Sequence, residues 1–205
     1  MTQASLSSPG WFGKLPGVGD FAHRRMPHAL RTRWDDWLHD GLGDLRAHHA
    51  DWIEHYLTAP VWGFLLGPGV AGDSAWIGAM APSVDRVGRY YPITVFAPLP
   101  ASAESPAAWW LAAHHLLMQA LEDDADAAHF ERLIVNTLSS AAPDLQGASA
   151  NGLSPCLPGV GRTAWTPASK PQGDAAMTID GLPQGPVFEL LFDMHPAAAS
   201  LEGRA

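Results

Sequence analysis

Apolar residues recur at three- and four-residue steps near the start of the chain, and this spacing predicts an amphipathic helix that begins near Pro27. Its apolar positions would share one face and its charged positions the other. The apolar set is Leu30, Trp34, Trp37, Leu38, Leu42 and Leu45, and the polar set is Arg31, Arg33, Asp35, Asp36 and His39. Gly41 and Gly43 are the positions at which this helix is expected to break.

Apolar residues have helical spacing in three more segments. A Pro that would end a helix or a Ser that would cap its start stands at some of the segment ends. Ser105 is the candidate N-cap of the longest one. The segments are 51–57, 106–121, and a stretch from Asp124 or Asp126 to Leu138.

Short apolar runs bounded by glycine and proline predict buried strands. They lie at 11–15, 61–66, 74–81, 91–97, 162–166, 175–179 and 187–192. Strands, then helices, then strands favour an α/β fold in which helices pack on one mixed sheet. A stretch at 139–158 that is rich in Ser, Pro, Gly and Ala predicts a loop too long for an ordinary connection, and therefore either mobile or functional.

A length of 205 residues and a hydrophobic fraction of 47% fit one domain with a sizeable core. We place that domain at 10–195, after a disordered N-terminus at 1–9 and before a tail at 196–205. No apolar run is long enough to span a membrane, and the polar N-terminus does not resemble a secretory signal. A single cysteine, Cys156, allows no intramolecular disulfide. These features favour a cytoplasmic protein.

The formal net charge of −9, without any run rich in Lys and Arg, argues against nucleic acid or an anionic membrane as the partner. The ten histidines show no metal-ligand spacing, and the glycines at 13–19 fit neither a phosphate loop nor a dinucleotide fingerprint. We therefore expect no metal, no cofactor and no small-molecule substrate.

Two short segments combine glycine, proline, aromatic and charged residues more densely than a plain loop does. They are GWFGKLPGVGDF at 10–21 and PSVDRVGRYYPIT at 82–94. Glycine permits close backbone approach, and charged groups beside apolar runs need partners. Both segments are therefore predicted to form turns locked by ion pairs, within each segment or between the two.

The charged residues of these segments suggest specific pairs. We expect Asp85 to be buried and ion-paired with Arg86, Arg89 or another arginine, and Asp20 is the alternative carboxylate. At least one of Arg86 and Arg89 should form such an internal pair. The other is then free to bind a carboxylate or a phosphate on a partner.

Ser83 is the candidate for nucleophilic chemistry, since a hydrolase needs an activated hydroxyl. Its surroundings, APSVD followed by a turn, do not resemble the strand-to-helix elbow that exposes a catalytic serine. We expect Ser83 and Asp85 to bond nearby backbone N–H groups instead. No catalytic residue is assigned, and we expect a protein that is not an enzyme, with a hydrolase using Ser83 as the alternative.

Together with WDDWL at 34–38, the two segments resemble the signature of the TagF (ImpM) family, accessory proteins of the bacterial type VI secretion system. The resemblance implies an α/β layered sandwich. It also implies a cytoplasmic factor that represses secretion after translation by acting on the forkhead-associated-domain scaffold protein of that system. A structural subunit of the secretion apparatus is the further alternative.

A repressor that occupies a scaffold needs a binding surface, and aromatic and arginine side chains are enriched at the hot spots of such surfaces. The candidate partner-binding residues are Trp11, Phe12, Arg86, Arg89 and Tyr90. We expect them on one side of the fold. The competing hypothesis is that they only hold the fold together.

Overall fold

A computed structural model describes residues 9–99, 105–141, 157–169 and 177–193. Its centre is a seven-stranded sheet with the order β2-β1-β5-β4-β3-β6-β7. The strands are β1 (Gly10–Lys14), β2 (Phe21–Arg24), β3 (Trp62–Leu66), β4 (Trp76–Ala81), β5 (Ile93–Pro98), β6 (Arg162–Pro167) and β7 (Met177–Asp180).

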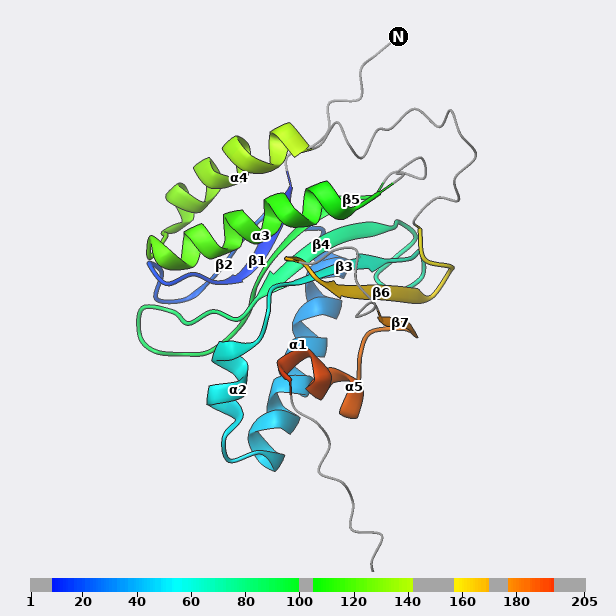
Figure 1. Ribbon diagram of the computed structural model, residues 1–205, viewed down its shortest axis with the longest axis horizontal. Helices are drawn as coiled ribbons and strands as arrows, with labels where there is room; N and C mark the ends of the chain where they lie inside the picture. The colour runs from blue at the N-terminus through cyan, green and yellow to red at the C-terminus, as the bar shows by residue number, and fades with distance from the viewer. Residues whose placement is uncertain (1–8, 100–104, 142–156, 170–176, 194–205) are drawn as a thin grey trace, which may run out of the picture.

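Helices cover both faces of this sheet, which confirms the predicted α/β class and its layered arrangement (Figure 1). One face carries α3 and α4, and the other carries α1, α2 and α5. The helices are α1 (His28–His48), α2 (Trp52–Thr58), α3 (Ala107–Glu122), α4 (Ala127–Ala141) and α5 (Pro186–Glu189), which a 3₁₀ turn at Leu190–Phe192 follows.

The sheet is antiparallel at every described strand pair, not mixed as the sequence suggested. Antiparallel neighbours can be joined by short connections, whereas parallel neighbours need a long crossover. Here β1–β2, β3–β4, β4–β5 and β6–β7 are each consecutive in sequence and paired in space. The α3–α4 pair returns the chain to the sheet so that β6 runs antiparallel to β3.

Side-chain alternation along the strands divides the core into two layers. On β5, Ile93 and Val95 pack beneath α3 and α4, while Phe96 faces α1. The same alternation places Trp11 and Phe12 of β1 in opposite layers. Two apolar layers, one on each side of the sheet, therefore hold the helices in place.

The register of α1 follows the apolar spacing of the sequence. All six apolar positions predicted to face the core are buried, and Trp34 is 1% exposed. Its ring stacks on Phe64 with 4.7 Å between centroids, and its Nε1–H donates to the Thr94 hydroxyl. The predicted break at Gly41 and Gly43 is wrong, because the helix continues to His48.

Two further expectations need correction. The apolar run at 187–192 is not a strand but α5 and the 3₁₀ turn, because Pro186 opens a helical turn that buries Phe188, Leu191 and Phe192 together. Strand β2 was not predicted, since its residues are mostly exposed at the sheet edge and show no apolar alternation.

Several expectations fall outside the described residues. The N-terminus at 1–8, the tail at 196–205 and residues 142–156 of the expected loop belong to this group. Residues 139–141, which were assigned to that loop, form the last turn of α4.

Candidate functional site

The two glycine-containing segments meet beside the ends of β1 and β4. The Ser83 hydroxyl donates to the carbonyl of Lys14 at 2.8 Å, and the backbone N–H of Arg86 donates to the carbonyl of Val18 at 3.1 Å. The prediction that the segments lock each other is thus confirmed.

The carboxylate of Asp85 is the centre of this junction, as Asp85 is 3% exposed. Its Oδ2 accepts from the Lys14 ammonium at 2.6 Å and from Arg89 Nε at 2.8 Å. Its Oδ1 accepts the backbone N–H groups of Val87 and Arg89 at 3.0 and 2.9 Å. Gly88 closes the turn with a φ of +84°, a conformation that favours glycine. The predicted ion pair with an arginine is confirmed, but its buried partner Lys14 was not foreseen.

The electrostatics of Asp85 follow from these contacts. Burial acts to raise the pKa of the carboxyl, but the hydrogen bonds from Lys14, Arg89 and the turn N–H groups outweigh it and hold the pKa well below its ordinary value. Asp85 therefore stays ionised and satisfied, and it does not behave as an acid or base poised for proton transfer.

Ser83 is also engaged inside the junction. It is 2% exposed, and its hydroxyl proton goes to a carbonyl, as described above. The Tyr56 hydroxyl bonds both the backbone N–H and the carbonyl of Ser83 at 2.9 Å. Burial raises the pKa of Tyr56, so this phenol stays protonated and able to donate. The geometry fits a structural connector rather than an exposed nucleophile.

The two arginines differ in the way the sequence suggested. Arg89 is held by Asp85, donates to the carbonyl of Gly19 and lies 3.9 Å from Asp20, while 53% of its side chain stays exposed. Arg86 is exposed and forms no ion pair with any residue of the described ranges. Arg86 is therefore the arginine that remains available at the surface.

A hollow of about 560 Å³ opens next to the junction, and we refer to it as the cationic groove. Cations and aromatic rings dominate its lining. The lining residues are Lys14, Phe21, Asp35, His39, Arg46, Trp52, Arg89, Tyr90 and Tyr91. They come from β1, β2, α1, α2 and the segment before β5, so distant parts of the chain build one surface.

The contacts inside the cationic groove fix its side chains. Arg46 lies over the Trp52 ring at 4.8 Å and donates to the carbonyl of Tyr90 at 3.3 Å. The Tyr91 hydroxyl donates to Asp35 at 2.6 Å, and burial followed by this carboxylate raises the pKa of Tyr91. Two of the groove's aromatic rings and one of its guanidinium groups are thus already positioned.

The predicted partner-binding residues divide into two groups. Trp11 and Phe12 are 0% and 4% exposed, and they lie in opposite core layers rather than on one surface. Arg89 and Tyr90 line the cationic groove, and Arg86 is close in the same turn. The structure therefore gathers three of the five candidates at the surface and buries the other two, Phe12 in the core layer on the side of α1 and Trp11 in the layer on the other side of the sheet.

Seven of the nine groove residues were not predicted as binding residues, namely Lys14, Phe21, Asp35, His39, Arg46, Trp52 and Tyr91. Phe21 and Lys14 belong to the first glycine-containing segment, so their inclusion was within reach of the sequence. Arg46 and Trp52 lie in α1 and α2 and join the groove only through the helix–helix turn. No local pattern marks them.

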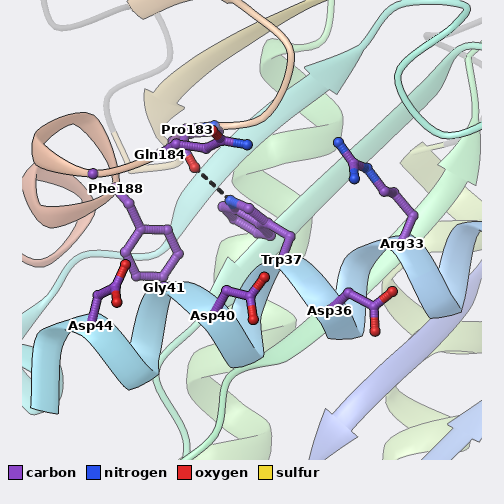
Figure 2. A pocket seen from close by; sticks show the side chains of 10 residues that line it. Arg33, Asp36, Trp37, Asp40, Gly41, Asp44, Pro183, Gln184 and Phe188 are labelled. Atoms are coloured by element: carbon purple, nitrogen blue, oxygen red, sulfur yellow. Dashed lines mark hydrogen bonds between the residues drawn. The ribbon is translucent and has the colours of Figure 1, made fainter. Parts of the chain in front are cut away.

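An acidic hollow of about 330 Å³ lies along α1 (Figure 2). Asp36, Asp40 and Asp44 stand in a row on the helix, and the Trp37 indole N–H donates to the carbonyl of Pro183 at 2.6 Å. No group of three or more His, Cys, Asp or Glu side chains within the described ranges is arranged to hold a metal ion. The two hollows therefore differ in charge, and of these two it is the cationic groove that adjoins the two segments; a third hollow, of about 520 Å³, also adjoins them, at Pro16, Pro82, Ser83 and Val84.

Comparisons with known proteins show the family of this chain and a solved structure of the same fold. Residues 10–137 match the sequence model of the TagF N-terminal domain, described as type VI secretion system-associated. The crystal structure of PA0076 from Pseudomonas aeruginosa PAO1 resembles this fold with a TM-score of 0.70 and 28% sequence identity, over 97% of this chain and 100% of that chain. No curated protein matches the sequence. None of the helices in the described ranges is both long and apolar enough to cross a membrane.

Proposed function

This chain belongs to the TagF family of type VI secretion system-associated proteins, and we propose that it is a non-enzymatic regulator of that system. In this proposal it acts in the cytoplasm after translation and represses secretion. It does so by binding the forkhead-associated-domain scaffold protein.

The observation that carries this proposal is the cationic groove. All nine residues that line it lie within the part of the chain that matches the family. Arginine, tyrosine and tryptophan are the side chains that most often dominate binding energy at interfaces, and the groove offers each of them in a partly exposed state. Such a surface suits recognition of a protein.

The state of the polar groups supports binding over catalysis. A nucleophilic serine needs an accessible hydroxyl beside a base. Ser83 instead donates to a backbone carbonyl in the core, and Asp85 is saturated by four donors. These groups stabilise the junction that shapes the groove, and the exposed side chains around them are left for the partner.

Calorimetry with the purified scaffold protein tests the proposal. The parent should bind, and Tyr90→Ala and Arg86→Ala should each weaken binding by about tenfold or more. Arg132→Ala is the matched control, because Arg132 is an exposed arginine on α4, on the opposite face of the sheet. Each variant must first show a parent-like melting curve.

Secretion measured in cells completes the test. Deleting the gene should raise secretion, and the parent and Arg132→Ala should repress it again while Tyr90→Ala should not. Absence of scaffold binding together with unchanged secretion after deletion would refute the regulator. Stoichiometric co-purification with baseplate components would instead favour the structural-subunit alternative.

A further inference from the structure

Three cations gather at the cationic groove of a chain whose formal net charge is −9. Lys14, Arg46 and Arg89 line the groove together with Asp35, but Asp85 pairs with Lys14 and Arg89, and Asp20 lies 3.9 Å from Arg89. Local potential, not net charge, decides which partner a surface attracts. Arg46 and the exposed part of Arg89 are therefore the groups that suit the groove to a negatively charged ligand.

The carboxylates near the groove already have partners within the protein. Asp35 accepts the Tyr91 hydroxyl, and Asp85 binds Lys14 and Arg89. Unlike Lys14 and Arg89, Arg46 forms no ion pair with any residue in the described part of the chain. Its guanidinium therefore has charge that no internal carboxylate offsets.

The two guanidinium groups are held in place before any ligand arrives. Arg46 is fixed by the Trp52 ring and by the carbonyl of Tyr90, and Arg89 by Asp85 and the carbonyl of Gly19. A preorganised donor loses less side-chain entropy when it binds. Guanidinium also matches a carboxylate in a planar, two-point geometry.

An exposed aromatic ring stands beside these cations. Phe21 is 45% exposed, although its ring packs on Tyr91 at 4.7 Å and stacks on Phe12 at 5.8 Å. Phe21 is thus an apolar residue that is held in place and still partly exposed to solvent at the groove. Burying this exposed apolar surface under an apolar side chain of a partner would contribute favourable free energy to binding.

We propose that the cationic groove binds an acidic peptide segment of a protein partner. Side-chain carboxylates of the segment engage Arg46 and Arg89, and a neighbouring apolar side chain packs on Phe21 and Trp52. This inference rests on the proposed function in taking the groove as the partner-binding surface, and it names the chemistry that the surface recognises.

Fluorescence anisotropy with synthetic peptides tests this recognition. The probe is a fluorescein-labelled peptide in which pairs of Glu alternate with single Phe, and two matched peptides carry Gln for Glu or Ala for Phe. The full chain should bind the Glu/Phe peptide, with affinity falling steeply as salt is added, because exposed charges are screened. Both matched peptides should bind about tenfold more weakly or worse.

Substitutions in the groove test whether the peptide binds there. Arg46→Gln should weaken binding of the Glu/Phe peptide by about tenfold, and Arg46→Lys should weaken it less, because the charge is kept and the planar fork is lost. Arg132→Gln should leave it unchanged. Equal binding of the Gln peptide, or full binding by Arg46→Gln, would overturn the proposal. So would tighter binding to a phosphoserine peptide or to phosphatidylserine vesicles than to the Glu/Phe peptide.

The scaffold protein distinguishes this inference from the proposed function. If the scaffold binds the parent and Arg46→Gln equally and the Glu/Phe peptide does not compete, the acidic-segment inference is wrong and the regulator stands. If the peptide binds at the groove and the scaffold does not bind, the scaffold partner is wrong and the acidic-segment inference stands.

Discussion

The Lys14 ammonium and the Asp85 carboxylate lie 2.6 Å apart with side chains that are 4% and 0% exposed, although the residues are 71 positions apart in the chain. The pair connects the end of β1 to the turn that follows β4. Because the charges are buried, each depends on the other. The shape of the surface turn that carries Arg86, Arg89 and Tyr90 depends on the same contact.

Removing the acid of this pair should destabilise the protein strongly. Asp85→Ala leaves the Lys14 ammonium buried without its partner, and we expect a loss of about 3–5 kcal/mol in the free energy of unfolding. Asp36→Ala, at an exposed carboxylate of α1, should change it by no more than about 0.5 kcal/mol. Urea denaturation measures both, and similar midpoints for the two variants would contradict the buried pair.

The same pair predicts a pH dependence. The pKa of Asp85 lies below the ordinary 3.8 in the folded state, so its stabilising effect is complete above that value and is lost as pH falls through the folded-state pKa. The difference in unfolding free energy between the parent and Asp85→Asn should therefore be constant at neutral pH. It should shrink as the solution is acidified below about pH 4. A difference that stays constant down to about pH 2 would be inconsistent with the depressed pKa.

The sequence pattern was enough to predict a structural feature where that feature depends on one helix or one turn alone. The face of α1 was predictable because a three- and four-residue apolar spacing from Leu30 to Leu45, roughly four helical turns, allows only one helix face to be buried. The Asp85 pair with an arginine was predictable because both groups lie in one short turn. Lys14 was not, since it reaches Asp85 only after β1 and β5 have paired.

The missed elements show a similar limit. Strand β2 forms through hydrogen bonds to β1 at the sheet edge, and its sequence has no alternation of apolar and polar residues that would predict a strand. The run at 187–192 is apolar enough for a strand, but α1 and α2 offer a surface on which a helical turn buries Phe188 and Phe192. Tertiary packing overrides local preference in both cases.

Trp34 should be the most costly single residue of α1 to truncate. It is surrounded by Phe64, Phe96 and Trp165, and its indole N–H is bonded to Thr94. We expect Trp34→Ala to lower the free energy of unfolding by about 3–5 kcal/mol, since a large cavity would remain. Thr32→Ala, on the exposed side of the same helix, should stay within about 0.5 kcal/mol. Chemical denaturation followed by circular dichroism checks both, and a Trp34→Ala protein as stable as the Thr32 control would refute the packing.

Gly41 and Gly43 should respond to alanine in opposite directions. Both lie inside α1, where alanine in place of glycine contributes about 0.5–1 kcal/mol of helix stability. A Cβ at Gly43 meets nothing within 4 Å, so Gly43→Ala should raise the melting temperature. A Cβ at Gly41 would lie closer to the Phe188 ring than van der Waals contact allows, and Trp37 and Phe192 hold that ring from the other sides.

Overpacking of this kind costs about 1–3 kcal/mol, which exceeds the helix gain, so Gly41→Ala should lower the melting temperature. A double-mutant cycle identifies the cause. In the background of Phe188→Ala the clash is gone, and Gly41→Ala should then stabilise the protein as Gly43→Ala does. Differential scanning calorimetry of the single and double variants gives the coupling, and a Gly41→Ala effect that is the same in both backgrounds would show that Phe188 is not the reason for glycine at this position.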